Sequence, residues 1–425
     1  MNVPEQFKAR MQRLLGEEYG QFIAVYGNPA VRGVRVNTLK AEAGDLLSAV
    51  PFSTDGSVPW CGEGFYTSEE KPGLYIEHAA GLYYVQEPSA MCAVPLFSEL
   101  SGKAVLDLCA APGGKSTQLA ARMRGSGILF CNEINFSRAK ALSQNIERMG
   151  VKNACVTVAP PGRLSEIYPA CFDSVLVDAP CSGEGMFRKE EGAAAEWSEA
   201  NVEMCARRQA EILESADALL RAGGELVYST CTFAPEEDEL QIERFLARHA
   251  DYTLVTMHKL MPHRVRGEGH FAALLKKLKG DSFDFPPAKG NVPKSCEKLW
   301  REFEERYLFV TFGNLFMAGE TLYSLPENCP APKLQTLRAG VRLGEFVKDR
   351  FEPSHSLAMC LKRGEAPFLE LGRDEARAYL GGLTFGCDRR GWAVAAYNGH
   401  PLGWVKAGGG VAKNHLPKGL RFVYN

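Results

Sequence analysis

The stretch Val105-Leu106-Asp107-Leu108-Cys109-Ala110-Ala111-Pro112-Gly113-Gly114-Lys115-Ser116-Thr117 decides the fold, because it joins an apolar run to a helical pattern through small residues. Similar short apolar runs recur along the chain with helical patterns between them. These runs cover residues 104–108, 127–131, 155–158, 174–177 and 225–228. Strands that alternate with helices build βαβ units. The sequence therefore predicts an α/β fold with a parallel sheet.

Length and composition fit a globular protein with more than one domain. The chain has 425 residues, of which 45% are hydrophobic and 24% are charged, and its formal net charge is −2. Such a composition excludes collagen, a long coiled coil and wholesale disorder. A near-neutral charge also argues against a histone-like polycation, although a local basic groove would still attract nucleic acid.

Thirteen cysteines lie as singletons between Cys61 and Cys387, without a Cys-x-x-Cys pair or a Cys/His cluster at zinc spacing. This pattern predicts free thiols, a cytoplasmic location and no metal site. The chain also lacks a secretory segment and a long apolar stretch, so we expect no association with a membrane.

The chain divides into four parts on composition and periodicity. Residues 1–73 predict a small α+β lead-in, and residues 74–285 hold the runs that predict the parallel sheet. Residues 286–300 contain prolines and lysines, which predicts a linker. Residues 301–425 carry several short β-like runs, so we expect a separate and mostly β module there.

Individual elements follow from the same patterns. Helices are predicted at 115–123, 136–149 and 205–220, and a late strand is predicted at 271–275. The β-like runs of the last part cover residues 308–312, 356–361, 391–397 and 403–406.

The loop that follows the first strand predicts a cofactor site, because its small residues let backbone N–H groups approach a ligand at the carboxyl edge of the sheet. A P-loop would need glycine where Cys109 stands, and the Gly-x-G-x-x-G fingerprint of dinucleotide sites is absent. The remaining candidate is S-adenosylmethionine. Glu133, at the end of the next strand, has the position of a carboxylate that accepts ribose hydroxyls.

Two further loops follow buried strands and each carries a cysteine. Asp178-Ala179-Pro180-Cys181 ends one strand, and Ser229-Thr230-Cys231 ends the next. Because the carboxyl ends of parallel strands meet at one edge of the sheet, we expect Cys181 and Cys231 to face the same crevice. One such cysteine is usually a packing residue, but two together favour chemistry.

These loops carry a family resemblance. Asp-Leu-Cys-Ala-Ala-Pro-Gly-Gly-Lys-Ser at 107–116, Asp-Ala-Pro-Cys-Ser-Gly-Glu-Gly at 178–185 and Tyr-Ser-Thr-Cys-Thr at 228–232 resemble the RNA cytosine-C5 methyltransferases of the Fmu/Sun type. The continuation Gly-Met-Phe-Arg-Lys at 185–189 and the long C-terminal extension are similar to the branch of that family that acts on 16S ribosomal RNA. The resemblance is good over residues 1 to about 280 and looser beyond.

The resemblance implies a class I (Rossmann-like) methyltransferase sheet with RNA-binding parts on either side, the C-terminal one PUA-like. It implies that S-adenosylmethionine is the cofactor and that RNA is the substrate, with 16S ribosomal RNA expected first and transfer RNA as the alternative. By the resemblance the cofactor would be bound by Cys109, Ala110, Ala111, Pro112, Gly113, Gly114, Lys115, Glu133 and Asp178. Cys231 would be the nucleophile, Cys181 would help to release the product, and Asp178 would take part in catalysis.

One departure concerns the adenine of the cofactor. The family often carries an acidic residue after the third strand, but the segment 158–163 of this chain reads Val-Ala-Pro-Pro-Gly-Arg. Adenine recognition is therefore expected to rest on backbone or on other groups.

The implied chemistry explains why thiols are needed. C5 of cytosine is a poor nucleophile, and a thiolate that adds to C6 converts the ring into an enamine whose C5 can attack a sulfonium methyl group. A helix that begins near Pro235-Glu236 is expected to help ionise Cys231. Asp178, protonated or hydrogen-bonded to N3, would stabilise the charge that develops on addition.

The substrate base must leave its stack, so we expect single-stranded or locally melted RNA. Two basic stretches, 259–279 and 391–425, are candidates for phosphate contacts. Three other classes remain open: a DNA cytosine-C5 enzyme that uses Cys181 as nucleophile, a non-catalytic RNA-binding protein of ribosome assembly, and, least favoured, a P-loop NTPase.

Overall fold

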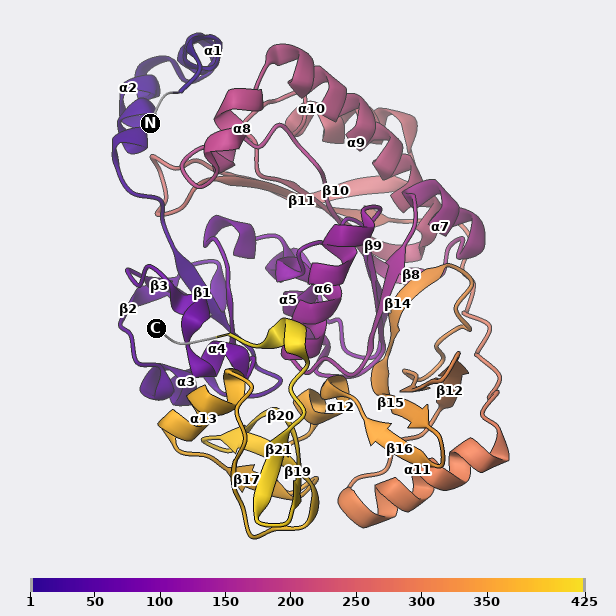
Figure 1. Ribbon diagram of the computed structural model, residues 1–425. Coiled ribbons are helices and arrows are strands. Elements are labelled where there is room, and N and C mark those ends of the chain that lie inside the picture. Colours follow the sequence, from indigo (N-terminus) through magenta and orange to yellow (C-terminus); the bar gives the residue numbers. More distant parts are fainter. Residues whose placement is uncertain (1–2, 423–425) are drawn as a thin grey trace.

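The computed structural model describes residues 3–422, and a long mixed sheet lies at its centre (Figure 1). Its eight strands follow the order β10-β11-β9-β8-β5-β6-β7-β14. Five neighbouring strands are parallel, as predicted: β5 (Ala104–Asp107), β6 (Ile128–Asn132), β7 (Ala154–Val158), β8 (Phe172–Asp178) and β9 (Leu220–Thr230). The antiparallel strands are β10 (Tyr252–Leu260), β11 (His270–Lys277) and β14 (Gln335–Ala339).

Helices cover both faces of this sheet, because successive strand residues point to opposite sides. Val105 and Leu129 are buried in one apolar cluster, whereas their neighbours Leu106 and Phe130 are buried in another. The helices of the first cluster are α5 (Gly114–Met123) and α6 (Phe136–Arg148), and those of the second are α7 (Pro161–Ile167), α9 (Glu199–Leu219) and α10 (Glu239–Arg248).

The N-terminal part adds a small antiparallel sheet with the order β2-β3-β1-β4. Arg35 joins this sheet to the first turn of α5, because its buried guanidinium donates hydrogen bonds to the Gly114 carbonyl and the Thr117 hydroxyl, both at 2.8 Å. The elements are α1 (Glu5–Leu15), α2 (Tyr19–Ala24), β1 (Gly33–Val36), α3 (Ala43–Ala49), β2 (Thr54–Val58), β3 (Cys61–Thr67), α4 (Ile76–Ala79) and β4 (Tyr83–Val85).

Helix α1 packs beside the loop that follows β8. The ring of Phe7 lies 5.0 Å from that of Phe187 and 5.5 Å from that of Trp197, between centroids. Trp197 ends the short helix α8 (Glu191–Glu196), so the start of the chain braces the segment beyond Cys181.

The C-terminal part forms two further sheets, with the orders β12-β13-β15-β16 and β17-β19-β20-β21-β18. Trp392 and Trp404 are buried in their core, as expected for packing residues. The elements are α11 (Lys294–Tyr307), β12 (Leu315–Ala318), β13 (Thr321–Ser324), β15 (Val341–Val347), β16 (Arg350–Pro353), α12 (His355–Cys360), β17 (Phe368–Glu370), α13 (Arg373–Leu380), β18 (Phe385–Gly386), β19 (Gly391–Tyr397), β20 (His400–Gly408) and β21 (Val411–Asn414). Among residues 3–422, no helix is both long and apolar enough to span a bilayer.

The C-terminal part is not separate from the central sheet, which corrects the prediction for residues 301–425. Strand β14 pairs antiparallel with β7 and closes that edge of the sheet. Arg338 anchors the pairing, because its buried guanidinium donates to Glu147 at 2.6 Å and to Ser356 at 2.9 Å.

Four predicted elements differ from the structure. Helix α11 begins at Lys294, inside the expected linker, because Trp300 and Phe303 are buried on one face of an otherwise charged segment. Residues 356–361 were expected as a strand but fall mainly in helix α12, whose N-cap Ser354 accepts the Leu357 N–H. Residues 308–312 form no strand. Helix α9 begins at Glu199 rather than 205, after the capping residue Ser198.

Replacing Arg338 with alanine should lower the free energy of unfolding by about 2 to 4 kcal/mol, because it leaves the partly buried Glu147 carboxylate without its partner. Urea denaturation measures the change. Arg342→Ala, which removes a half-exposed ion pair with Glu345, is the matched control and should stay within about 0.5 kcal/mol of the unaltered protein. Equal, small effects of both substitutions would contradict the anchoring role of Arg338.

Candidate active site

The loop that is predicted to bind the cofactor, residues 108–113, lies between β5 and α5, at the carboxyl edge of the sheet. Gly113 adopts φ +110°, and a Cβ atom there would lie 3.1 Å from Leu142 Cδ1, so this position requires glycine. The N–H of Ala110 donates to the Asn132 carbonyl at 2.8 Å and holds the loop against the end of β6. Residues 108–113 thus form a tight turn that is held against the end of β6, and the remaining predicted residues, Gly114 and Lys115, lie in the first turn of α5.

Glu133 is buried at the end of β6. Its carboxylate accepts the Asn135 N–H at 2.9 Å and lies 3.6 Å from the Arg138 guanidinium. The neighbouring Asn132 amide donates to the Leu108 carbonyl at 3.2 Å and to the Ala159 carbonyl at 2.9 Å, which ties three strand ends together. Glu133 therefore has a fixed position beside the loop.

Asp107 is a buried carboxyl group that the sequence did not single out. It accepts the Ser116 hydroxyl at 2.6 Å through Oδ2, whereas Oδ1 has no hydrogen-bond partner. Burial raises its pKa to about 7. An unpaired acceptor at the end of β5 fits a ligand with N–H donors, such as the amino group of an amino-acid cofactor.

Asp178 and Lys115 form an ion pair across the crevice, with 2.9 Å between Lys115 Nζ and Asp178 Oδ2. Burial opposes ionisation of Asp178, but the charge of Lys115 and hydrogen bonds from Lys115 and Ser229 lower its pKa below the usual value. The structure therefore favours a carboxylate at Asp178 over the neutral acid that the sequence left open.

His270 lies next to this ion pair. Its side chain is buried, with Nε2 at 3.8 Å from Asp178 Oδ1, and neither ring nitrogen has a hydrogen-bond partner. Burial lowers its pKa to about 3, so the ring is neutral. Sequence reasoning gave His270 no role.

Cys181 and Cys231 meet in the crevice, as predicted. Their sulfur atoms lie 3.2 Å apart, and all thirteen cysteines are free thiols. The hydrogen bond to Cys231, followed by burial, raises the pKa of Cys181 well above its usual value. Cys181 therefore keeps its proton and can donate S–H to the sulfur of Cys231.

Glu237 holds both cysteine loops, and sequence reasoning missed it. Its carboxyl oxygens accept the Ser182 hydroxyl at 2.5 Å and the Ser182 N–H at 3.0 Å. The same hydroxyl lies 2.9 Å from Thr232 Oγ1, so a residue next to each cysteine is tied to Glu237. Gln209 adds hydrogen bonds to Glu237 and to the Pro180 carbonyl.

Cys231 does not lie at a helix N-terminus, which corrects the expectation for Pro235-Glu236. Helix α10 begins at Glu239, because the buried Asp238 carboxyl is held by Thr230 at 2.5 Å and Lys259 at 3.0 Å in a preceding turn. The positive charge of this site is instead that of Lys115, which is paired with Asp178.

The first predicted basic stretch is largely neutralised. Five of its six cations lie in ion pairs with acidic side chains: Lys259 with Asp238 and Glu239, Arg264 with Glu18, Arg266 with Asp55, Lys276 with Glu225 and Lys277 with Asp217. The net charge that 259–279 offers to phosphate groups is therefore smaller than its sequence indicates. In the part of the chain that the structure describes, no cluster of His, Cys, Asp or Glu could hold a metal ion.

Family models and whole-chain relatives agree with this geometry. A model described as 16S rRNA methyltransferase RsmB/F matches residues 96–276. A ribosomal RNA small subunit methyltransferase F from Aeromonas hydrophila is 34% identical, over 94% of this chain and 93% of that protein. The chain belongs to the RsmB/F family of 16S rRNA methyltransferases. The similarly named Klebsiella pneumoniae protein is 32% identical over 98% and 96% of the two chains.

The RsmB/F match extends beyond the sheet. The N-terminal domain of 16S rRNA methyltransferase RsmF matches residues 3–88, its first C-terminal domain 302–361 and its PUA domain 366–422. A solved methyltransferase homologue protein from Pyrococcus horikoshii is 29% identical with a TM-score of 0.59, over 65% of this chain and 96% of that one. The predicted Rossmann-like methyltransferase sheet and PUA-like module are confirmed.

Glu237→Gln should change the pH dependence of stability. Burial raises the pKa of Glu237 from 4.5 to about 7, so in this interval an unfolded chain loses the proton that the folded protein keeps. The folded protein therefore loses stability as pH rises from about 4.5 to 7, and glutamine, which cannot ionise, avoids this loss. Urea denaturation across this range should show the variant gaining stability relative to the unaltered protein. If the difference in free energy of unfolding between the two proteins stayed constant across this pH range, the raised pKa of Glu237 would be contradicted.

Proposed function

We propose that this protein transfers a methyl group from S-adenosylmethionine to C5 of a cytosine in 16S ribosomal RNA, through a covalent bond between Cys231 Sγ and C6 of the base. The observation that carries the proposal is the pair of free thiols, 3.2 Å apart, beside the Asp178–Lys115 ion pair. The names of the relatives support ribosomal RNA as the substrate.

The two thiols take different roles because their surroundings differ. Cys181 stays protonated and donates to its partner, which stabilises a thiolate on Cys231. Lys115, paired with Asp178 at 2.9 Å, supplies the positive charge of the site. Cys231 is therefore the nucleophile, and Cys181 acts as a thiol in the later steps.

Asp178 would hold the target base during addition. When Cys231 Sγ bonds to C6, electron density moves through C5 toward N3. The Asp178 carboxylate can accept a hydrogen bond from the exocyclic amino group, and the Lys115 ammonium paired with it can stabilise the charge that develops on the ring. After C5 has gained the methyl group, its hydrogen leaves as a proton and the electron pair of that bond expels the Cys231 sulfur. A water molecule that the Cys181 thiol orders would accept the proton.

The cofactor would lie on the loop from Cys109 to Gly114, beside Lys115. S-adenosylmethionine, when bound, supplies an electrophilic methyl group. Glu133 would accept hydrogen bonds from the ribose hydroxyls, as the acidic residue does in dinucleotide sites. The unpaired Asp107 Oδ1 would accept one from the amino group of the methionine moiety. Backbone groups near Ala159 would recognise the adenine, since no acidic residue follows β7.

RNA would be bound by the parts on either side of the sheet, residues 1–73 and 301–425. The target base must be extruded from its stack to reach the thiols, which suits a loop or a locally melted segment. The neutralised stretch 259–279 contributes little free charge, so the C-terminal lysines Lys406, Lys413 and Lys418 are the better candidates for phosphate contacts.

Cys231→Ala should abolish methyl transfer to 16S ribosomal RNA, because no other thiol can add to C6. Cys181→Ala should instead trap a protein–RNA adduct that survives a denaturing gel, since release of the product is blocked. Labelled methyl groups and mass spectrometry for 5-methylcytidine measure the first effect. Cys205→Ala, on α9, is the matched control and should retain transfer. If Cys181→Ala abolished transfer and Cys231→Ala trapped the adduct instead, the mechanism of a DNA cytosine-C5 enzyme would be favoured.

Glu133→Ala should raise the Kd for S-adenosylmethionine by about 10- to 100-fold, which corresponds to the loss of charge-assisted hydrogen bonds worth about 1.5 to 3 kcal/mol. Calorimetry measures the binding, and Glu166→Ala on the surface of α7 is the control. The absence of any heat with the unaltered protein, for both S-adenosylmethionine and its demethylated product, would favour a non-catalytic RNA-binding protein.

A further inference from the structure

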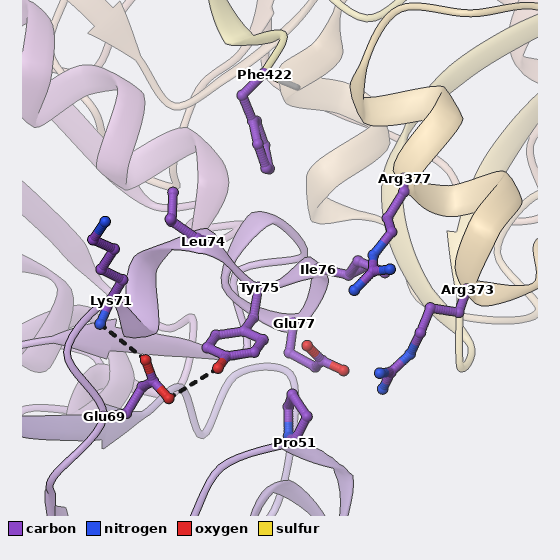
Figure 2. Close-up of a pocket in the computed structure, with 10 residues that line it drawn as sticks. All are labelled: Pro51, Glu69, Lys71, Leu74, Tyr75, Ile76, Glu77, Arg373, Arg377 and Phe422. Carbon is purple, nitrogen blue, oxygen red and sulfur yellow. Dashed lines mark hydrogen bonds between the residues drawn. The ribbon is translucent and has the colours of Figure 1, made fainter. Parts of the chain in front are cut away.

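A cavity of about 390 Å³ lies apart from the cysteine loops, between the N-terminal part and helix α13 (Figure 2). Its walls come from the segment around α4 on one side and from α13 with Phe422 on the other. The two sides are packed together, because Ile76 and Ala80 share an apolar cluster with Ala376 and Tyr379. The volume is within the range of small-molecule sites.

The floor of this cavity contains an unsatisfied acceptor. The side chain of Glu77 is only 2% exposed, and its Oε1 has no hydrogen-bond partner. Figure 2 shows its carboxyl group turned toward the guanidinium groups of Arg373 and Arg377. Burial raises the pKa of Glu77 above the usual value, while the two arginines act in the opposite direction. A ligand with an N–H donor would satisfy this oxygen.

The opposite wall is cationic. Arg373 and Arg377 lie one turn apart on α13 with exposed side chains, and Lys71 is exposed across the cavity. Arg373 Nε lies 3.5 Å from the Tyr397 hydroxyl, which orients its guanidinium. Two guanidinium groups at one edge of the cavity can donate several hydrogen bonds to the oxygens of a phosphate group.

Aromatic rings provide the remaining surface. Tyr75 donates its hydroxyl to Glu69 at 2.9 Å and packs against Phe52, with 5.2 Å between ring centroids, so its ring is held in place. Phe422 points into the same cavity from the C-terminal side (Figure 2). A planar base can stack on such rings, whatever its identity.

We propose that this cavity binds one nucleotide of the RNA substrate, with the phosphate on Arg373 and Arg377, the base against Tyr75 and Phe422, and an exocyclic amino group on Glu77. The proposal rests on the proposed function, because it takes RNA to be the substrate. Adenine, guanine and cytosine carry the required amino group, whereas the N3–H of uracil lies between two carbonyl oxygens that the Glu77 carboxylate repels. The site would therefore anchor a nucleotide distant from the methylated one and would reject uridine.

Binding of short fluorescent oligoribonucleotides, oligo(A), oligo(C) and oligo(U), to the full chain tests the proposal by anisotropy. The unaltered protein should bind oligo(A) and oligo(C) more tightly than oligo(U). The double variant Arg373→Ala/Arg377→Ala should weaken binding of oligo(A) and oligo(C) about tenfold and reduce the slope of log K against log salt by about 1.4, for two lost phosphate contacts. Arg207→Ala/Lys298→Ala removes the same charge from α9 and α11 and should leave both quantities unchanged.

Glu77→Gln tests separately whether the Glu77 carboxylate selects bases that carry an amino group. Its amide donates as well as accepts, so the variant should bind oligo(U) as well as the other oligomers while its melting temperature stays close to that of the unaltered protein. The proposal would be overturned if Glu77→Gln still bound oligo(U) more weakly than oligo(A) and oligo(C). It would also be overturned if the affinity of Arg373→Ala/Arg377→Ala for oligo(A) lay within twofold of that of Arg207→Ala/Lys298→Ala. Methyl transfer to 16S ribosomal RNA is measured in parallel. If the unaltered protein transfers no methyl group, the proposed function is refuted. If transfer is normal but the variants bind the oligomers as the unaltered protein does, only the assignment of the cavity is refuted.

Discussion

The register between β8 and β9 is the constraint on which the site depends. Asp178 pairs with Ser229 at the last step of the parallel ladder, so the two strands end at the same level. The loops that follow then leave the sheet side by side, and each carries a cysteine at a short distance from its strand. A slip of the register would separate the sulfur atoms and turn the residues of one strand to the opposite face. Glu237 stabilises this arrangement, because it accepts hydrogen bonds from Ser182, next to Cys181. The Ser182 hydroxyl in turn contacts Thr232, next to Cys231.

Much of the sheet and of the cofactor loop could be predicted from the sequence, because local signals determine them. Apolar runs of strand length, Gly113 at a positive φ and the small residues around it are readable without tertiary knowledge. The meeting of Cys181 and Cys231 followed from a topological rule about strand ends rather than from their spacing of 50 residues. The family motifs then supplied roles that the pattern alone left open.

The features that escaped prediction depend on contacts between distant segments. Glu237 stands in an acidic run that is typical of a solvated turn, and only its contact with Ser182, 55 residues away, makes it a buried clamp. Helix α12 is buried on all sides, so it has no amphipathic period to reveal it. The cations of 259–279 look free in the sequence, whereas their acidic partners come from other segments, such as Glu18 for Arg264.

Strand β14 has a consequence for biosynthesis. It covers the open edge of β7, and its anchoring residue Arg338 lies 191 residues after its partner Glu147. While the ribosome is still making the chain, the parallel strands can therefore assemble long before their border is covered. During that interval an unpaired strand edge is exposed to other nascent chains, a hazard that the cell must manage by rapid elongation or by chaperones. A chain truncated before residue 335 would keep the thiols and the cofactor loop but lack this cover permanently.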